Sequence, residues 1–317
     1  MDGPVERAEV DMVDIPDRGW AHCTRLQHEG VRLVVTTDVG PRIIECSIDG
    51  GPNLFKEFEA ELGRTAGDEY LLFGGHRLWL APEAFPRSYA PDFGQVRVEP
   101  LPAGARFVQP EEPENRIVKS IAVEFIGRRQ LRVVHAIANA NPWAVELAPW
   151  AMTLMAQGTH AIVPQEPYRP HPEWLDPART LTVWGYTRMD DPRVSWGARY
   201  IRLREDASVP QKFKLGVQNR ERWVACWSGG WLMVRTFGFE ADARYPDAGC
   251  NCEMFTMPGF LEMETLGPLR VLQPGQETRH EEIWHFWPLP ELPMDDDALA
   301  EVFARCLPEL RYPGDPS

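Results

Sequence analysis

The chain has 317 residues, 25% of them charged and 44% hydrophobic, with 33 Lys and Arg against 47 Asp and Glu, a formal net charge of −14. This composition excludes a disordered chain, and so acidic a surface repels nucleic-acid phosphates and anionic lipids. We therefore expect a small, neutral ligand and neither nucleic acid nor a membrane as partner. No apolar run reaches the roughly 18 residues of a membrane span, and residues 1–17 contain no apolar signal core, which favours a cytoplasmic protein.

Most of the chain has the residue pattern of β-strands. Residues 31–36 and 42–48 predict a hairpin, whose turn contains Asp38, Gly40 and Pro41. Further strands are predicted at 116–126, 130–138, 143–155, 181–186, 200–203, 212–217, 223–227, 231–239, 252–256, 260–266 and 278–286. Many short strands at short intervals, with 30 Pro and 25 Gly to form the turns, predict an all-β fold, a large antiparallel sandwich.

One helix is predicted, near the C-terminus within residues 294–311. The three aspartates at 295–297 can cap its first turn and interact favourably with its dipole. Apolar residues then follow at helical spacing and form one stripe, namely Leu299, Val302, Phe303 and Cys306. We expect this stripe to cover a face or an edge of a sheet, and Pro308 to end or kink the helix.

The chain is predicted to be a single domain over residues 1–317. Residues 1–20 are expected to form an N-terminal extension, and the proline-rich segment 164–177 a long surface loop that rims a site. The six cysteines contain no CxxC pair, and the spacing of Cys250 and Cys252 does not fit a shared zinc site. We expect reduced, buried thiols and no metal.

The first candidate for chemistry is the segment from Gly74 to Glu83, with sequence GGHRLWLAPE. The double glycine predicts a tight turn, on which His76 and Glu83 are candidates for proton transfer or hydroxyl binding. Arg77 would donate hydrogen bonds, and Trp79 would offer a stacking surface. The alternative is a turn that carries a structural ion pair between Arg77 and Glu83.

The second candidate is the predicted strand at 260–266. Alternate residues of a strand share a face, so Glu262 and Glu264 point the same way, with Phe260 and Leu266 beside them. Two carboxylates with apolar neighbours can raise the pKa of one of them and yield a general base. The alternative is a solvated outer face.

Aromatic residues supply the remaining candidates. Trp150 lies on a strand face that is either core or pocket wall. Trp184 and Tyr186 share a predicted strand face and could stack on the C–H side of a sugar ring, while Lys214 could donate to hydroxyls or to a carboxylate. The alternative for these three is core packing with a solvated lysine. His160, after a Gly-Thr pair, is a further candidate.

These segments together resemble an uncharacterised bacterial family of the galactose mutarotase-like (aldose 1-epimerase-like) superfamily. The resemblance rests on residues 74–83, 181–187, 191–193 and 262–268 with Pro274-Gly275, and it extends from about Val31 to Trp287. It implies a β-supersandwich with a short C-terminal helix, a sugar-sized cleft on the concave face of the larger sheet, and no cofactor.

The resemblance also implies roles for individual residues. In mutarotases a Glu on a late strand takes the proton of the anomeric hydroxyl and a His donates a proton to the ring oxygen. Glu264 matches that base, but Trp150 stands in the place of the acid, so that His76, or His160 as second choice, would supply it. Phe73 stands where sugar mutarotases have a His or a phosphate-gripping Arg, which argues against hexose 6-phosphates.

Three hypotheses follow. The first is an isomerase of the aldose 1-epimerase type for a neutral sugar or sugar-like hydroxylated ring, with Glu264 as base and His76 as acid. The expected substrate contacts are Arg77, Trp79, Glu83, Trp150, His160, Trp184, Tyr186, Lys214 and Glu262. The second hypothesis is a non-catalytic carbohydrate-binding protein, and the third is a scaffold recruited as a lyase, cyclase or isomerase for a non-sugar ligand. The first requires His76 and Glu264 to face each other across one cleft.

Overall fold

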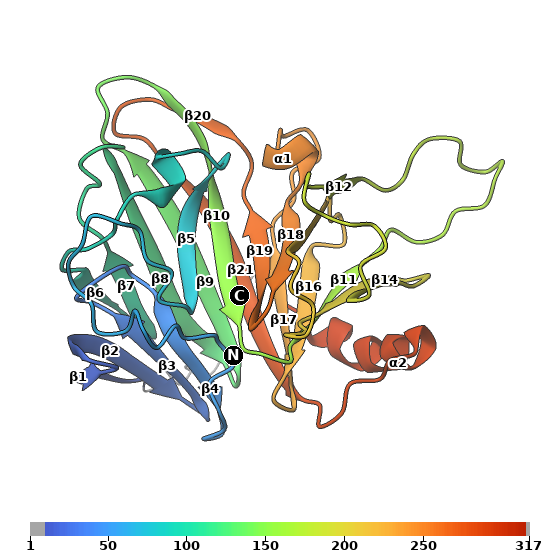
Figure 1. The fold of residues 1–317 in the computed structure, drawn as a ribbon, viewed down its shortest axis with the longest axis horizontal. Coiled ribbons are helices and arrows are strands. Elements are labelled where there is room, and N and C mark those ends of the chain that lie inside the picture. Colours follow the sequence, from blue (N-terminus) through green and yellow to red (C-terminus); the bar gives the residue numbers. More distant parts are fainter. Residues whose placement is uncertain (1–9, 315–317) are drawn as a thin grey trace, which may run out of the picture.

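The computed structural model describes residues 10–314 and consists mainly of two antiparallel sheets (Figure 1). The strands of the larger sheet are β1 (Asp11–Asp17), β2 (Trp20–His28), β3 (Val31–Thr36), β4 (Ile43–Ile48), β5 (His76–Ala81), β10 (Val145–Met155), β12 (Leu181–Val183), β15 (Phe213–Val217), β18 (Cys252–Met257), β19 (Phe260–Leu266) and β20 (Arg270–Leu272). Their order is β1-β2-β3-β4-β5-β10-β19-β18-β15-β12, and β20 pairs with β10.

The smaller sheet contains the other ten strands. They are β6 (Arg97–Leu101), β7 (Gly104–Val108), β8 (Ile117–Gly127), β9 (Gln130–Asn139), β11 (His160–Pro164), β13 (Val194–Trp196), β14 (Tyr200–Arg204), β16 (Trp223–Ser228), β17 (Trp231–Phe237) and β21 (Glu277–Pro288). Their order is β13-β14-β11-β16-β17-β21-β9-β8-β7-β6. The two sheets confirm the predicted all-β sandwich.

Alternation along each strand divides its side chains between the core and the outside. On β19, Leu261 and Met263 belong to the main core, which contains residues of both sheets. Phe260 and Leu266 belong to a second apolar cluster, built on β5, β10, β18 and β19 of the larger sheet. The larger sheet therefore has an apolar, aromatic outer face as well as an apolar inner one.

The predicted C-terminal helix is α2 (Asp296–Cys306). The Asp295 side chain accepts hydrogen bonds from the N–H groups of Asp297 and Ala298 and so caps it, as expected. Its apolar stripe packs on strands of the smaller sheet, which confirms that it covers a sheet face (Figure 1). The remaining helical elements are η1 (Arg87–Tyr89), α1 (Pro246–Gly249) and η2 (Leu307–Glu309).

Strand ends follow the predictions closely, with one exception. The strand predicted at 181–186 ends at Val183, and the other predicted strands begin and end within two residues of the expected positions. Residues 11–17, expected in an N-terminal extension, form the edge strand β1, while residues 1–9 lie outside the described part. All six cysteines are buried, free thiols, as expected. Among the described helices, none is long and apolar enough to cross a membrane.

Candidate functional site

The segment predicted as a double-glycine turn is for the most part a strand. Gly74 and Gly75 have φ of 112° and 71°, which only glycine adopts readily, and β5 begins at the next residue. Successive residues of a strand point to opposite faces, so His76 and Arg77 face opposite ways. Met152 of β10 is the Cα partner of both Arg77 and Glu264 and fixes them on the same, outer face of the larger sheet.

His76 points into the core between the two sheets. Its Nδ1 lies 2.8 Å from Thr153 Oγ1, and its Nε2 lies 2.6 Å from Nε2 of His135, on β9 of the smaller sheet. The imidazole is fully buried there. His76 and Glu264 therefore lie on opposite faces of one sheet, and the predicted acid–base pair across a shared cleft is wrong. The error lies in the parity of one residue at the start of β5.

His76 and His135 also belong to a buried group of potential metal ligands. Among the described residues, their ring nitrogens and a carboxylate oxygen of Glu282 lie within 4.8 Å of one another. However, Arg235 Nη1 lies 3.3 Å from Glu282 Oε1 and already supplies a cation. Burial alone would raise the pKa of Glu282, but Arg235 and the nearby histidines lower it to about 2. This arrangement is that of a buried ion pair, and a divalent ion would add to the charge of Arg235.

Glu264 is the centre of a polar cluster on the outer face. Trp150 Nε1 donates a hydrogen bond of 2.8 Å to Glu264 Oε2, and Lys214 Nζ lies 2.9 Å from the same oxygen. Lys214 also pairs with Glu253, at 2.8 Å. Glu264 is 0% and Lys214 4% exposed, yet Glu264 Oε1 has no hydrogen-bond partner. A buried acceptor without a partner in the protein is available for a donor from a ligand.

The register of the hairpin between β18 and β19 brings Glu253 into this cluster. Glu253 is the Cα partner of Glu264, so the two carboxylates lie side by side. Burial raises the pKa of Glu253 well above its usual range, and Lys214 only partly opposes this. For Lys214, burial lowers the pKa, but Glu264 and Glu253 more than offset it, and the pKa is raised. The lysine is therefore a charged group, not a nucleophilic amine.

Two indole rings enclose the Lys214 ammonium. Nζ lies 4.6 Å from the ring centre of Trp150 and 4.7 Å from that of Trp184, both within cation–π range. Tyr186, 46% exposed, follows Trp184 outside regular strand structure. The predicted common strand face of Trp184 and Tyr186 is therefore not formed by a strand, although both residues lie near the cluster.

Gly216 of β15 leaves the space that Trp184 occupies. A Cβ at this position would lie 2.6 Å from Cys250 Sγ and 3.3 Å from Trp184 Cη2. We expect Gly216→Ala to displace Trp184 from Lys214 and to lower the free energy of unfolding by about 1–3 kcal/mol, as overpacking does. Urea denaturation followed by tryptophan fluorescence measures both effects. Gly185→Ala, where a Cβ meets nothing within 4 Å, is the control, and equal stability of the two variants would contradict this packing.

Arg77 and Glu262 form a second polar pair on the same face. Arg77 Nη2 lies 3.4 Å from Glu262 Oε1, and its guanidinium carbon lies 4.8 Å from the ring centre of Trp79. Burial raises the pKa of Glu262 to about 7, although Arg77 opposes the shift. Glu262 and Glu264 are separated by two residues of one strand, which span about 7 Å. The sheet thus presents two differently tuned carboxyl groups at the separation of a sugar ring and its hydrogen bonds.

Two other predicted contacts lie elsewhere. Glu83, in the loop after β5, accepts a hydrogen bond from Tyr89 Oη at the edge of the cluster, so Arg77 pairs with Glu262 rather than with Glu83. His160 begins β11 in the smaller sheet, where its ring packs 5.9 Å from that of Trp227. It does not share the outer face with Glu264.

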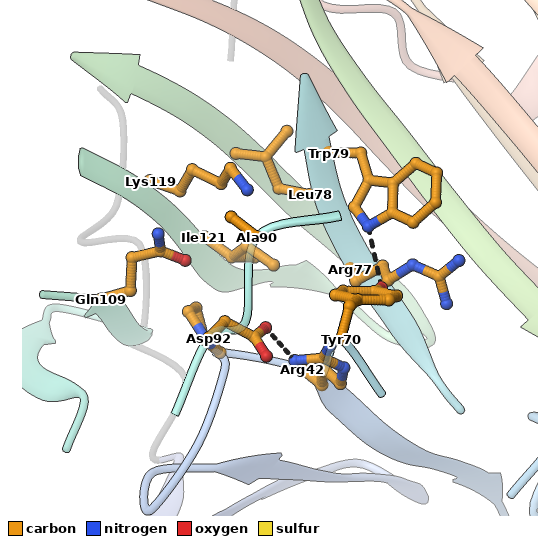
Figure 2. A pocket seen from close by; sticks show the side chains of 11 residues that line it. Arg42, Tyr70, Arg77, Leu78, Trp79, Ala90, Asp92, Gln109, Lys119 and Ile121 are labelled. Carbon is orange, nitrogen blue, oxygen red and sulfur yellow. Dashed lines mark hydrogen bonds and ion pairs between the residues drawn. The ribbon is translucent and has the colours of Figure 1, made fainter. Parts of the chain in front are cut away.

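A small cavity lies beside β5, and Figure 2 shows its lining. Its volume of about 10 Å³ is enough for one water molecule and too small for a sugar. Lys119 and Gln109 line one side, while Arg77 and Trp79 extend on the other, where Trp79 Nε1 donates to Tyr70 Oη (Figure 2). A ligand of Glu264 therefore does not occupy this cavity.

Comparison with solved structures places the sandwich among known folds. A galactose mutarotase-like protein from Clostridium acetobutylicum matches 89% of this chain and 99% of its own, with 9% identity and a TM-score of 0.54. A galactose mutarotase related enzyme from Lactobacillus acidophilus matches 86% and 100%, with 9% identity and a TM-score of 0.52. The fold is galactose mutarotase-like. A TPR-domain containing protein from Parabacteroides distasonis shares this mutarotase-like fold over 98% of the present chain and 63% of its own, with 10% identity and a TM-score of 0.54.

Neither a protein-family model nor a curated protein matches the sequence. At identities of 9–10% the solved structures establish the mutarotase-like fold and not the reaction, because one fold supports many activities. What the protein does must therefore be argued from the side chains on the outer face of the larger sheet.

Proposed function

We propose that the protein is an acid–base isomerase of the aldose 1-epimerase type, acting on a neutral sugar or a sugar-like hydroxylated ring. The observation that carries the proposal is Glu264, a buried carboxylate with one oxygen held by Trp150 and Lys214 and the other without a partner. The aromatic outer face supports a ring-shaped ligand. Lys214 and Arg77 are each paired with carboxylates, which favours a neutral ligand over an anionic one.

Glu264 acts as the base and Glu262 as the acid in this proposal. Glu264 takes the proton of the anomeric hydroxyl, the carbon–oxygen double bond forms, and the bond between the anomeric carbon and the ring oxygen breaks. Glu262 gives its proton to the ring oxygen, so that the open-chain aldehyde and one proton exchanged at each carboxyl result. Rotation of the aldehyde and the reverse transfers close the ring as the other anomer. Arg77 orients Glu262, and Lys214 orients Glu264.

The second candidate is a protein that binds a carbohydrate without isomerising it. It is favoured by Trp150 in the place of the usual acid, and by the position of both candidate histidines away from the outer face. Exchange NMR on a panel of neutral monosaccharides separates the two functions. Interconversion of anomers above the spontaneous rate supports the isomerase, whereas binding without acceleration supports the second candidate.

The rate of isomerisation is expected to depend on the protonation of Glu262. The acid must carry its proton, and burial, opposed by Arg77, sets the pKa of Glu262 at about 7. The rate should therefore fall as the pH rises above about 7. Glu262→Gln should lower the rate on the order of 10²-fold and remove this high-pH limb. Rates measured against pH for both proteins test this, and an unchanged limb in Glu262→Gln would assign the acid to another residue.

A further inference from the structure

A strained turn beside the site holds a carboxyl group that the mechanism above does not use. Asp247 and Ala248, within α1, have φ of 49° and 61°, in the left-handed region that residues other than glycine rarely adopt. The turn is fixed in part by a hydrogen bond of 3.3 Å that Thr182 Oγ1 donates to the backbone oxygen of Asp247. Its effect is to bring the Asp247 side chain into hydrogen-bond contact with the carboxyl of Glu253.

Two carboxyl groups can form a hydrogen bond only if one of them keeps its proton. Burial raises the pKa of Asp247 above its usual value, and Glu264 and Glu83 act in the same direction. Lys214 is the cation that faces Asp247, and it also pairs with Glu253 and Glu264. One ammonium cannot neutralise three neighbouring carboxylates in a desolvated site, so a proton remains on the pair.

The cluster is more than a group of acids, because it contains polar atoms without a partner in the protein. Glu264 Oε1 is one of them, and Nε and Nη1 of Arg77 are others. Both side chains are at least nine-tenths buried. Atoms of this kind are satisfied by a ligand, and the charge of Glu264 decides whether that ligand meets a base.

We propose that Asp247 is a positioning residue that shares one proton with Glu253 and thereby keeps Glu253 neutral. With Glu253 neutral, the charge of Lys214 acts on Glu264 alone and keeps the base ionised and ready to accept a proton. Asp247 does not touch the reacting atoms. The use made of the proton rests on the proposed function, but the existence of the shared proton does not.

Infrared difference spectroscopy at neutral pH tests the shared proton directly. The carbonyl band of a protonated carboxyl group should be present in Glu262→Gln, in which the other group that titrates near neutrality is absent. Introducing Asp247→Asn or Glu253→Gln into that background should remove the band, since an amide donates to the remaining carboxylate and leaves it ionised. Asp242→Asn, at an exposed aspartate of the same segment, should leave it intact. A band that survives both Asp247→Asn and Glu253→Gln would overturn the proposal.

The rate profile tests what the proton does. In Asp247→Asn an ionised Glu253 competes for Lys214, so the low-pH limb of the isomerisation rate should move up by about one pH unit, while Asp242→Asn should not shift it. An unshifted limb would overturn the positioning role. If no neutral sugar is isomerised although the infrared band behaves as expected, the proposed function fails and the proton-sharing pair stands.

Discussion

Glu264→Gln should lower the enzyme-catalysed interconversion of anomers by roughly 10²–10⁴-fold, the usual contribution of a general base. The amide has nearly the shape of the carboxylate and can still accept hydrogen bonds from Trp150 and Lys214, but it cannot take a proton. Exchange NMR on the sugar that the wild-type protein isomerises fastest measures the effect. Glu291→Gln, at an exposed position, should retain the wild-type rate.

The result has to be separated from a loss of the fold. Lys214 remains paired with Glu253 in this variant, so we expect a cooperative unfolding transition, which circular dichroism can follow. A folded Glu264→Gln protein with the full wild-type rate would remove Glu264 from the mechanism. It would leave the mutarotase-like fold unaffected.

Arg235→Leu should have the largest effect on stability, a loss of about 3–5 kcal/mol in the free energy of unfolding. Arg235 and Glu282 form an ion pair between the two sheets, and both are at most 1% exposed. Without the guanidinium, Glu282 keeps only the hydrogen bonds from Thr265 Oγ1 and Trp284 Nε1. Urea denaturation at neutral pH measures the loss. Arg132→Leu, which removes a half-exposed ion pair with Glu281, should cost no more than about 1 kcal/mol.

The same pair predicts how stability changes with pH. The pKa of Glu282 is lowered to about 2 in the folded protein, so its contribution is present above the ordinary pKa of a glutamate and is lost as the pH falls toward 2. In Arg235→Leu this dependence should become smaller, because the charge that lowers the pKa is gone. Equal stability of Arg235→Leu and Arg132→Leu would mean that the pair does not hold the sheets together.

The sequence predicted the fold well because most strands carry their own signals. Alternating β-branched and aromatic residues between glycines and prolines located strands such as β3 and β19 with the observed ends. The edge strand β1 was missed because its residues are mostly polar, and β5 because Gly74 and Gly75 suggested that the turn continued. Local chemistry does not show where a turn gives way to a strand when the register is set by a distant partner, here β10.

The candidate site was predictable in part for the same reason. Alternation correctly placed Glu262 and Glu264 on one face, and the structure shows that face to be buried rather than solvated. His76 was misplaced because one residue of parity decides between the core and the outer face. Glu253 could have been found, since a two-residue turn between the predicted strands 252–256 and 260–266 sets it opposite Glu264. Asp247 could not, because a strained turn places it.

The most direct test of the account is the indole N–H signal of Trp150 in protein labelled with ¹⁵N-tryptophan, assigned through its absence from Trp150→Phe. This N–H donates to Glu264, so a ring that binds over the base must change its surroundings. We expect titration with at least one neutral sugar to shift the Trp150 signal in a saturable way. If the sugars that bind or react leave Trp150 unchanged and shift only other indoles, the ligand does not lie over Glu264, and the proposed site is contradicted.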